Sequence, residues 1–309
     1  MSGANSSSVI RSALLAWYVR RGRARLPWRT VRDPYYTLVS EFMLQQTQVD
    51  RVVPRFEAFV ARFPDFAALA RASLADVLRA WKGLGYNSRA VRLRAVAEAV
   101  ETRYGGTMPS DAGELRSLPG IGRYTAAAIR AFAFDLDDAP VDTNVRRIVH
   151  RACFGIEHPR RASARELDER ARALVPPGRA HDWNSSLMDL GASICTARAP
   201  KCSICPLRRG CAAAPIDPAS LERLRKSVAK TRSPQEAVPF EKTTRYARGR
   251  IVDRLRDLGA GERISLLDLH RVLEPVLPDR SLDDVRGFVS ALERDGLLAS
   301  DGERIALRE

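Results

Sequence analysis

Hydrophobic residues recur at three- and four-residue spacing through most of the first 212 positions of the chain. One such run consists of Phe56, Phe59, Val60 and Phe63. The next consists of Leu74, Val77, Leu78 and Trp81. This spacing places apolar side chains on one face of an α-helix, and alternating runs typical of strands are nearly absent. The pattern therefore predicts a mainly α protein over this part of the chain.

The pattern changes after residue 212. Residues 213–240 are rich in Ala, Pro, Lys, Arg and Ser, which predicts a basic linker. Beyond it, the pattern predicts helices over 246–258, 266–273 and 281–296, followed by a hairpin that turns at Asp301-Gly302. Three helices and a small hairpin are the order of a winged helix-turn-helix module. We therefore expect a small C-terminal winged-helix-like α+β module over 241–309, with its arginines facing outward.

Composition narrows the class of partner. With 309 residues, 45% of them hydrophobic, the chain can bury more than one core. Its 51 Lys and Arg residues exceed its 37 acidic residues, for a net charge of +14, which favours a polyanionic partner such as a nucleic acid. A solvated basic surface is the alternative that charge alone leaves open. No apolar run approaches the roughly 20 residues that span a bilayer, so we expect a cytoplasmic monomer with no membrane partner.

Four of the five cysteines form one compact run, Cys195-x6-Cys202-x2-Cys205-x5-Cys211. Cys153 lies apart in an apolar helical stretch and is expected to be a small buried residue. In a reducing compartment the clustered cysteines favour metal over disulfides. Zinc ribbons usually contain two short Cys-x2-Cys pairs, whereas this run contains one. We therefore expect a [4Fe–4S] cluster on the four thiolates, with structural zinc as the alternative.

Residues 118–126, LPGIGRYTA, predict a glycine turn between two helices. Gly120 and Gly122 allow the backbone to approach a phosphate closely, and the following helix presents its free N–H groups to that phosphate. A plain connector between helices is the alternative for this segment taken by itself.

Two carboxylates lie in further segments of interest. Asp142 precedes a helical pattern in PVDTNVRR (140–147), a place where aspartate is ordinarily an N-cap. Glu41 lies in SEFMLQQTQV (40–49), which follows LPWR (26–29). Taken alone, these polar side chains would be equally compatible with a solvated helix surface.

In combination and order, these segments resemble the helix-hairpin-helix DNA glycosylases that carry an iron–sulfur cluster, and among them the MutY-type adenine glycosylases. The resemblance extends over residues 9–212, two thirds of the chain. It implies an N-terminal helix (1–32) that packs on the cluster domain. It also implies a helical domain (33–135) with wedge loops and the helix-hairpin-helix, and a domain (136–212) that holds the catalytic aspartate helix and the cluster.

The same resemblance implies a pair of catalytic carboxylates. Breaking an N-glycosidic bond builds positive charge on the deoxyribose, which an ionised Asp142 would stabilise. Asn144 would orient that carboxylate. A protonated Glu41 would donate its proton to the adenine ring, because adenine is a poor leaving group until it is protonated.

The resemblance also implies DNA contacts. Base chemistry requires extrusion of the base, and Gln46 would form one wedge and Tyr86 of the Gly83–Tyr86 turn the second. Arg29, Thr47, Gly120, Gly122 and Arg123 are expected to contact DNA as well.

Tyr124 takes the position at which bifunctional relatives have the lysine that forms a Schiff base. Tyrosine cannot form one, so we expect a monofunctional enzyme that leaves an abasic site.

Two features depart from the MutY pattern. Ser185 takes a place where the family often has Gln or Glu against the flipped adenine, and residues 241–309 do not resemble the usual Nudix-like β-rich domain. The expected substrate is duplex DNA with adenine opposite 8-oxoguanine or guanine, met at the nucleoid of a bacterium or archaeon. A thymine or uracil mismatch glycosylase of the same fold and a non-catalytic iron–sulfur DNA-binding regulator are the alternatives.

Overall fold

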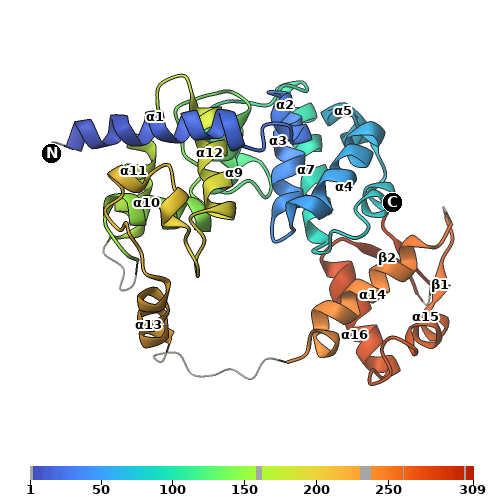
Figure 1. Ribbon diagram of the computed structural model, residues 1–309. Helices are drawn as coiled ribbons and strands as arrows, with labels where there is room; N and C mark the ends of the chain where they lie inside the picture. Colours follow the sequence, from blue (N-terminus) through green and yellow to red (C-terminus); the bar gives the residue numbers. More distant parts are fainter. Residues whose placement is uncertain (1–2, 158–161, 230–237, 260, 303) are drawn as a thin grey trace. The chain divides into compact units, whose positions relative to one another are not determined.

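The computed structural model of the chain describes residues 3–157, 162–229, 238–259, 261–302 and 304–309. Helices dominate these residues, and a small three-stranded sheet lies near the C-terminus (Figure 1). The predicted mainly α fold with a small C-terminal α+β part is confirmed. The chain forms two compact units, of which unit 1 comprises Met1–Leu38, Pro109–Ser117 and Ile121–Pro234. Unit 2 comprises Val39–Met108, Leu118–Gly120 and Gln235–Glu309.

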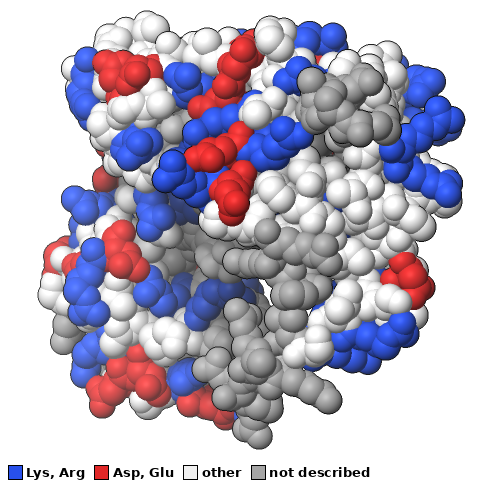
Figure 2. All heavy atoms as spheres, turned by 90° about the vertical axis from the view of Figure 1, so that its left-hand side faces the viewer, with Lys and Arg blue, Asp and Glu red and all other residues white. Residues whose placement is uncertain are grey.

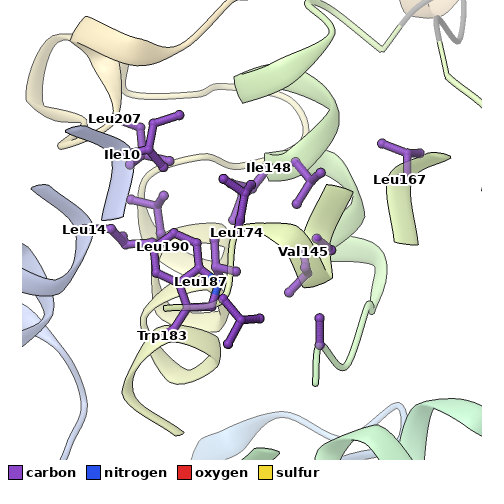
Figure 3. Packing of buried hydrophobic residues seen from close by; sticks show 14 of the residues in the cluster. Ile10, Leu14, Val145, Ile148, Leu167, Leu174, Trp183, Leu187, Leu190 and Leu207 are labelled. Atoms are coloured by element: carbon purple, nitrogen blue, oxygen red, sulfur yellow. The ribbon is translucent and has the colours of Figure 1, made fainter. Parts of the chain in front are cut away.

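Unit 1 is built from helices, most of which pack around a large hydrophobic core. Its elements are α1 (Gly3–Arg21), α2 (Pro27–Thr30), the start of α3 (Pro34–Leu44), α8 (Ala112–Ser117), α9 (Arg123–Phe132), α10 (Thr143–Cys153), α11 (Ala164–Ala173), α12 (Ala180–Ser193), η1 (Cys202–Ile204), η2 (Arg208–Gly210) and α13 (Pro218–Ala229). Leu14 of α1, Ile148 of α10 and Leu187 of α12 meet in the core shown in Figure 3. The N-terminal helix therefore packs on the helices that precede the cysteine run.

The same core anchors the cysteine segment. Leu207, which lies between the third and fourth cysteines of the run, is 3% exposed and belongs to the core of α1, α10 and α12 (Figure 3). Asp142 and Ser163 cap the N-termini of α10 and α11 through their side chains, which fixes where these two helices begin. Local capping and apolar burial together determine the backbone path on both sides of the cysteines.

The stretch predicted as a basic linker contains a helix instead. Residues 218–229 form α13, and Leu221 is fully buried against Ala213 and Ile216. These three apolar residues bury one another, which an unstructured linker would leave exposed. Residues 230–237 of the predicted linker lie outside the described residues.

Unit 2 contains α4 (Val49–Arg62), α5 (Phe66–Arg71), α6 (Leu74–Ala80) and α7 (Ser88–Tyr104). Asp65 and Ser73 cap α5 and α6, and the rings of Phe59 and Trp81 meet edge to face at 5.8 Å between centroids. This division differs from the predicted 33–135 domain, because the helices α8 and α9 that flank the glycine turn fall in unit 1.

The C-terminal module has the predicted order of elements. It consists of η3 (Phe240–Lys242), α14 (Thr244–Arg256), β1 (Ile264–Ser265), α15 (Leu266–Leu273), α16 (Leu282–Arg294), β2 (Leu298–Asp301) and β3 (Arg304–Leu307). The antiparallel sheet has the order β1-β3-β2, with Ala299 opposite Ala306. Strand β1 was not predicted, because two residues are too few for a periodic pattern. Helix α14 packs on α6, so the module belongs to unit 2.

Acidic and basic side chains are mixed on one face of the chain. On the face drawn in Figure 2, acidic side chains lie among the Lys and Arg side chains. Several basic residues of the chain form ion pairs, such as Arg165 with Glu169 at 2.7 Å. The net positive charge therefore does not gather into one uninterrupted patch on that face. Among the residues described, no helix is both long and apolar enough to cross a membrane.

Candidate functional site

Asp142 is held in place through both of its carboxylate oxygens. As N-cap of α10 it accepts a hydrogen bond at Oδ1 from the Val145 backbone N–H at 2.7 Å. Its Oδ2 accepts from Asn144 Nδ2 at 3.0 Å. Asn144 is itself fixed, because its Oδ1 accepts from Arg147 at 2.9 Å, and Arg147 also donates to the Cys195 carbonyl. The residue is thus an N-cap and at the same time a carboxylate with one fixed orientation.

Glu41 lies on α3 and is half-buried. It belongs to unit 2, whereas Asp142 belongs to unit 1.

The glycine turn before α9 has the backbone expected for contact with an anion. Gly120 has a φ of +77°, and a Cβ there would lie 3.1 Å from the Arg92 side chain, so only glycine fits without strain. Gly122 is the N-cap of α9 and provides no side-chain cap. A Cβ at Gly122 would meet nothing within 4 Å, so the space before the α9 N-terminus is open. Arg123 is exposed and pairs with Asp168 at 3.2 Å, and Tyr124 is half-buried on the same helix.

The structure gathers the four clustered cysteines around one small cavity. Cys195, Cys202, Cys205 and Cys211 are all half-buried and line this cavity with Arg151, Lys201 and Arg208. Arg151 donates to the Cys195 sulfur at 3.6 Å. Burial raises the pKa of Cys205 to about 11, and it also raises the pKa of Cys211. Among the described residues, no three His, Cys, Asp or Glu side chains have the geometry of a preformed metal site.

Cys153 lies apart from the cavity and is half-buried rather than fully buried. It packs against the core of unit 1 and accepts a hydrogen bond from Arg170 at 3.4 Å.

The two predicted wedge residues share an uncommon backbone conformation. Gln46 has a φ of +58° and Tyr86 a φ of +45°, in the left-handed region that disfavours side chains. Such residues cost about 1–3 kcal/mol each and persist where the surrounding structure holds them. Both are exposed, Tyr86 by 39%, and Tyr86 follows Gly85, whose φ is +68°. The two residues with strained backbones are therefore residues whose side chains are exposed to solvent.

A buried arginine that sequence reasoning missed connects the two wedge segments. Arg89 on α7 is 4% exposed. Its guanidinium donates to the carbonyl oxygens of Met43 (2.9 Å), Gln45 (2.8 Å), Leu84 (2.9 Å) and Gly85 (3.1 Å), and to Thr47 Oγ1 (3.3 Å). Burial lowers its pKa to about 10. The available signal was its place on the apolar face of α7, four residues before Leu93 and seven before Val96, both of which are buried.

Arg29, predicted to contact DNA, lies in an internal ion pair. Its side chain is 9% exposed and lies 2.9 Å from Asp189, which is 3% exposed. Arg23 binds the same carboxylate through its side chain at 2.7 Å and its backbone N–H at 2.7 Å. Burial raises the pKa of Asp189, but the charges and hydrogen bonds of Arg29 and Arg23 outweigh it, and the net pKa is lowered. Asp189 was missed because nothing in its sequence context distinguishes it.

Ser185 lies wholly inside unit 1. Its hydroxyl and that of Tyr18 have no hydrogen-bond partner of good geometry among the described residues. They are nevertheless close enough that Ser185 lowers the pKa of Tyr18, although burial is stronger and raises that pKa overall. The buried position explains why a small residue fits there.

The helical fold, with a glycine turn before α9 and an aspartate that caps α10, agrees with a helix-hairpin-helix protein of base excision repair. The HhH-GPD superfamily model of base excision DNA repair proteins matches residues 39–177. The chain is 32% identical to a thermostable thymine-DNA glycosylase, with a TM-score of 0.63 over 68% of this chain and 96% of that one. An endonuclease III in a DNA complex, 22% identical with a TM-score of 0.56 over 71% of this chain and 98% of that one, shares the fold.

Sequence relatives narrow the class. The adenine DNA glycosylase of Mycolicibacterium smegmatis is 41% identical over 94% of this chain and 95% of its own length. That of Mycobacterium tuberculosis is 37% identical over 94% and 93%. The mouse adenine DNA glycosylase is 41% identical over 67% of this chain and 42% of its own length. The chain belongs to the MutY-type adenine DNA glycosylase family.

Replacing Arg89 with methionine should release both wedge segments, because it leaves several buried carbonyl groups without a donor. We expect the free energy of unfolding to fall by about 3 kcal/mol. Hydrogen–deuterium exchange should also become faster in residues 42–47 and 83–86. Arg103→Met, an exposed position on the same helix, is the control. Equal exchange in both variants would show that Arg89 does not hold these segments.

Asp189→Asn should destabilise the protein in a pH-dependent way. The folded-state pKa of Asp189 is lowered, so its ion pair stabilises the fold above the unfolded value, and this contribution is lost as pH falls through the folded value. Denaturant unfolding should show a deficit of about 3 kcal/mol at pH 7. The deficit should shrink below about pH 4. Asp283→Asn, at an exposed pair, should show little deficit at either pH. A deficit for Asp189→Asn that stays constant with pH would contradict this assignment.

Proposed function

We propose that the chain hydrolyses the N-glycosidic bond of adenine mispaired with 8-oxoguanine or guanine in duplex DNA, acting as a monomer. The observation that carries this proposal is the Asp142 carboxylate, with one oxygen bound by the α10 N-terminus and the other by Asn144. The kinship with adenine DNA glycosylases along nearly the whole chain supports adenine as the base.

Asp142 and Glu41 have different roles in the proposed reaction. The Val145 N–H at the α10 N-terminus and the Asn144 amide fix the Asp142 carboxylate in one orientation, which suits a group that stabilises positive charge on the sugar. Glu41 donates the proton that makes adenine a leaving group. Water then completes the hydrolysis, and an abasic site remains.

The glycine turn and the wedge residues bind the DNA. Gly120, Gly122 and the open N-terminus of α9 bind a backbone phosphate, assisted by Arg123. Gln46 and Tyr86 insert into the base stack when the adenine leaves it. Their exposed positions and fixed left-handed backbones support this role. Arg29 and Thr47, both engaged inside the protein, position neighbouring groups rather than contact DNA.

Cys195, Cys202, Cys205 and Cys211 hold a [4Fe–4S] cluster. Four sulfur donors around one cavity, with Arg151 beside Cys195, suit a cluster whose thiolates carry negative charge. These four cysteines would hold the cluster between α12 and α13, and their bonds to it would fix the segment 195–211. Lys201 and Arg208 at this loop supply positive charge for phosphates.

Tyr124 makes the enzyme monofunctional. A half-buried phenol at the start of α9 has no amine for a Schiff base, so strand cleavage does not accompany base release.

A thymine mismatch glycosylase is the second candidate. It is favoured by the 32% identity to the thymine-DNA glycosylase and by the buried Ser185 at a place where a Gln or Glu was expected.

Base release from defined duplexes tests the proposal. Protein is incubated with A·8-oxoG, A·G, T·G or U·G duplexes and the products are treated with hot alkali. We expect strand breakage at adenine, and only after alkali. Breakage confined to T·G or U·G would support the second candidate, and no breakage on any duplex would overturn both.

Glu41→Gln and Asp142→Asn should each abolish adenine release. Both substitutions are nearly isosteric, so binding to the mismatched duplex should change little while the single-turnover rate falls by at least about 100-fold. Glu169→Gln, at an exposed ion pair with Arg165 on α11, is the control and should retain most of the rate. Near wild-type release by either variant would remove that residue from the mechanism.

Metal analysis tests the cluster. The purified protein should contain about four irons per chain and absorb broadly near 400 nm. Cys202→Ser should lose iron and weaken DNA binding, whereas Cys153→Ser should keep both. One zinc and no iron would show that the structural-zinc alternative is correct.

A further inference from the structure

The Tyr86 side chain contacts the C-terminal module. Arg245 of α14 donates a hydrogen bond to the Tyr86 hydroxyl, and its guanidinium carbon lies 5.2 Å from the centroid of the Tyr86 ring. The same guanidinium lies 4.8 Å from the centroid of Phe240 in η3. Arg245 therefore lies between two aromatic rings, one from the module and one from the wedge turn.

The turn that contains Tyr86 is also contacted by Arg89 of α7, in the helical part of unit 2. The guanidinium carbon of Arg89 lies 5.7 Å from the Tyr86 centroid, and Arg89 donates to the Leu84 and Gly85 carbonyls. Two arginines thus contact the Tyr86 ring. Arg89 is buried in the helical part of unit 2, and Arg245 belongs to the module.

Further contacts show that the module is docked on this turn. Arg256, 7% exposed, donates to the Leu78 carbonyl and to Asn87 Oδ1, both at 2.7 Å. Lys82 pairs with Asp257 at 2.8 Å. Next to these contacts lies a cavity of about 840 Å³, lined by both wedge segments and by the module, including Gln46, Tyr86, Phe240 and Arg245. The wedge residues and the module therefore share one surface.

We propose that Arg245 is a positioning residue for the Tyr86 wedge, so that the C-terminal module is part of the device that inserts into DNA. The proposal rests on the proposed function for the role of Tyr86. A tyrosine with a left-handed backbone at an exposed turn needs support to keep one orientation. Arg245 supplies it through a hydrogen bond and through stacking, which methionine of similar length cannot reproduce.

A double-mutant cycle tests the coupling in the full chain. Arg245→Met, Tyr86→Leu and the double variant are compared for single-turnover base release and for the fluorescence of 2-aminopurine placed at the extruded position. Arg245→Met should lower both readouts about tenfold and leave binding to matched duplex nearly unchanged. In the Tyr86→Leu background, which lacks both the hydroxyl and the ring that Arg245 contacts, the same change should cost less than about twofold. Arg245→Lys, which keeps a donor and a charge, should recover part of the loss.

Arg271→Met is the matched control, since Arg271 is an exposed arginine of the same module that pairs with Asp268. It should behave as wild type. Equal losses in Arg245→Met and Arg271→Met would show that only total charge matters, and a full loss that persists in the Tyr86→Leu background would show that Arg245 acts elsewhere. Either result overturns the proposal.

A measurement without DNA separates this proposal from the proposed function. Hydrogen–deuterium exchange in residues 83–88 should be faster in Arg245→Met than in Arg271→Met, whichever base the enzyme releases. If wild-type protein releases no base, the proposed function fails, and unchanged exchange would overturn the positioning role separately.

Discussion

The burial of one guanidinium group determines the shape of the segments that we assign to DNA insertion. Arg89 gives up its hydration, which is costly for a charged group, and the cost is offset by backbone carbonyls from two separate segments. Because the donor geometry of arginine is planar and rigid, these carbonyls are fixed relative to one another. The strained φ angles of Gln46 and Tyr86 persist because the residues beside them are held in this way.

Unit 1 also contains arginines that donate to backbone carbonyls inside the protein, and these residues account for part of the positive charge of the chain. Arg151 is 1% exposed, pairs with Glu157 and donates to the Thr196 carbonyl beside the first clustered cysteine. Arg147 joins Asn144, next to the proposed catalytic aspartate, to the Cys195 carbonyl. These arginines connect loops instead of meeting solvent. Net charge therefore overstates the cationic surface available to DNA, and the dispersed charges of Figure 2 agree with this view.

Sequence patterns predicted most of the fold but fewer of the connections that hold the proposed sites. The helical periodicity of residues 9–212 and the order of elements in the C-terminal module both agree with the structure, since apolar burial is a local signal. Helix α13 was taken for a linker because its few buried positions, such as Leu221, are surrounded by charged residues. Arg89, Asp189 and Arg245 gave no distinct signal, because each acquires its role from residues far away in sequence. The buried ion pair of Arg29 could not be predicted from the sequence either, because its partner Asp189 is also distant in sequence.

The C-terminal module differs from the β-rich domain expected of the family, yet its position within unit 2 gives it a direct connection to the wedge turn. The match to the mycobacterial relatives leaves only a small part of the chain unmatched, so most of the module is shared with enzymes named adenine DNA glycosylases. Arg256 of α14 is buried and bound to Asn87 and Asp253, whereas Arg245 stays exposed, as expected from the sequence, and still contacts Tyr86. A module bound in this way supports the turn before any DNA arrives. The contribution to DNA insertion that we propose for the module therefore rests on the geometry of Tyr86 and not on charge alone.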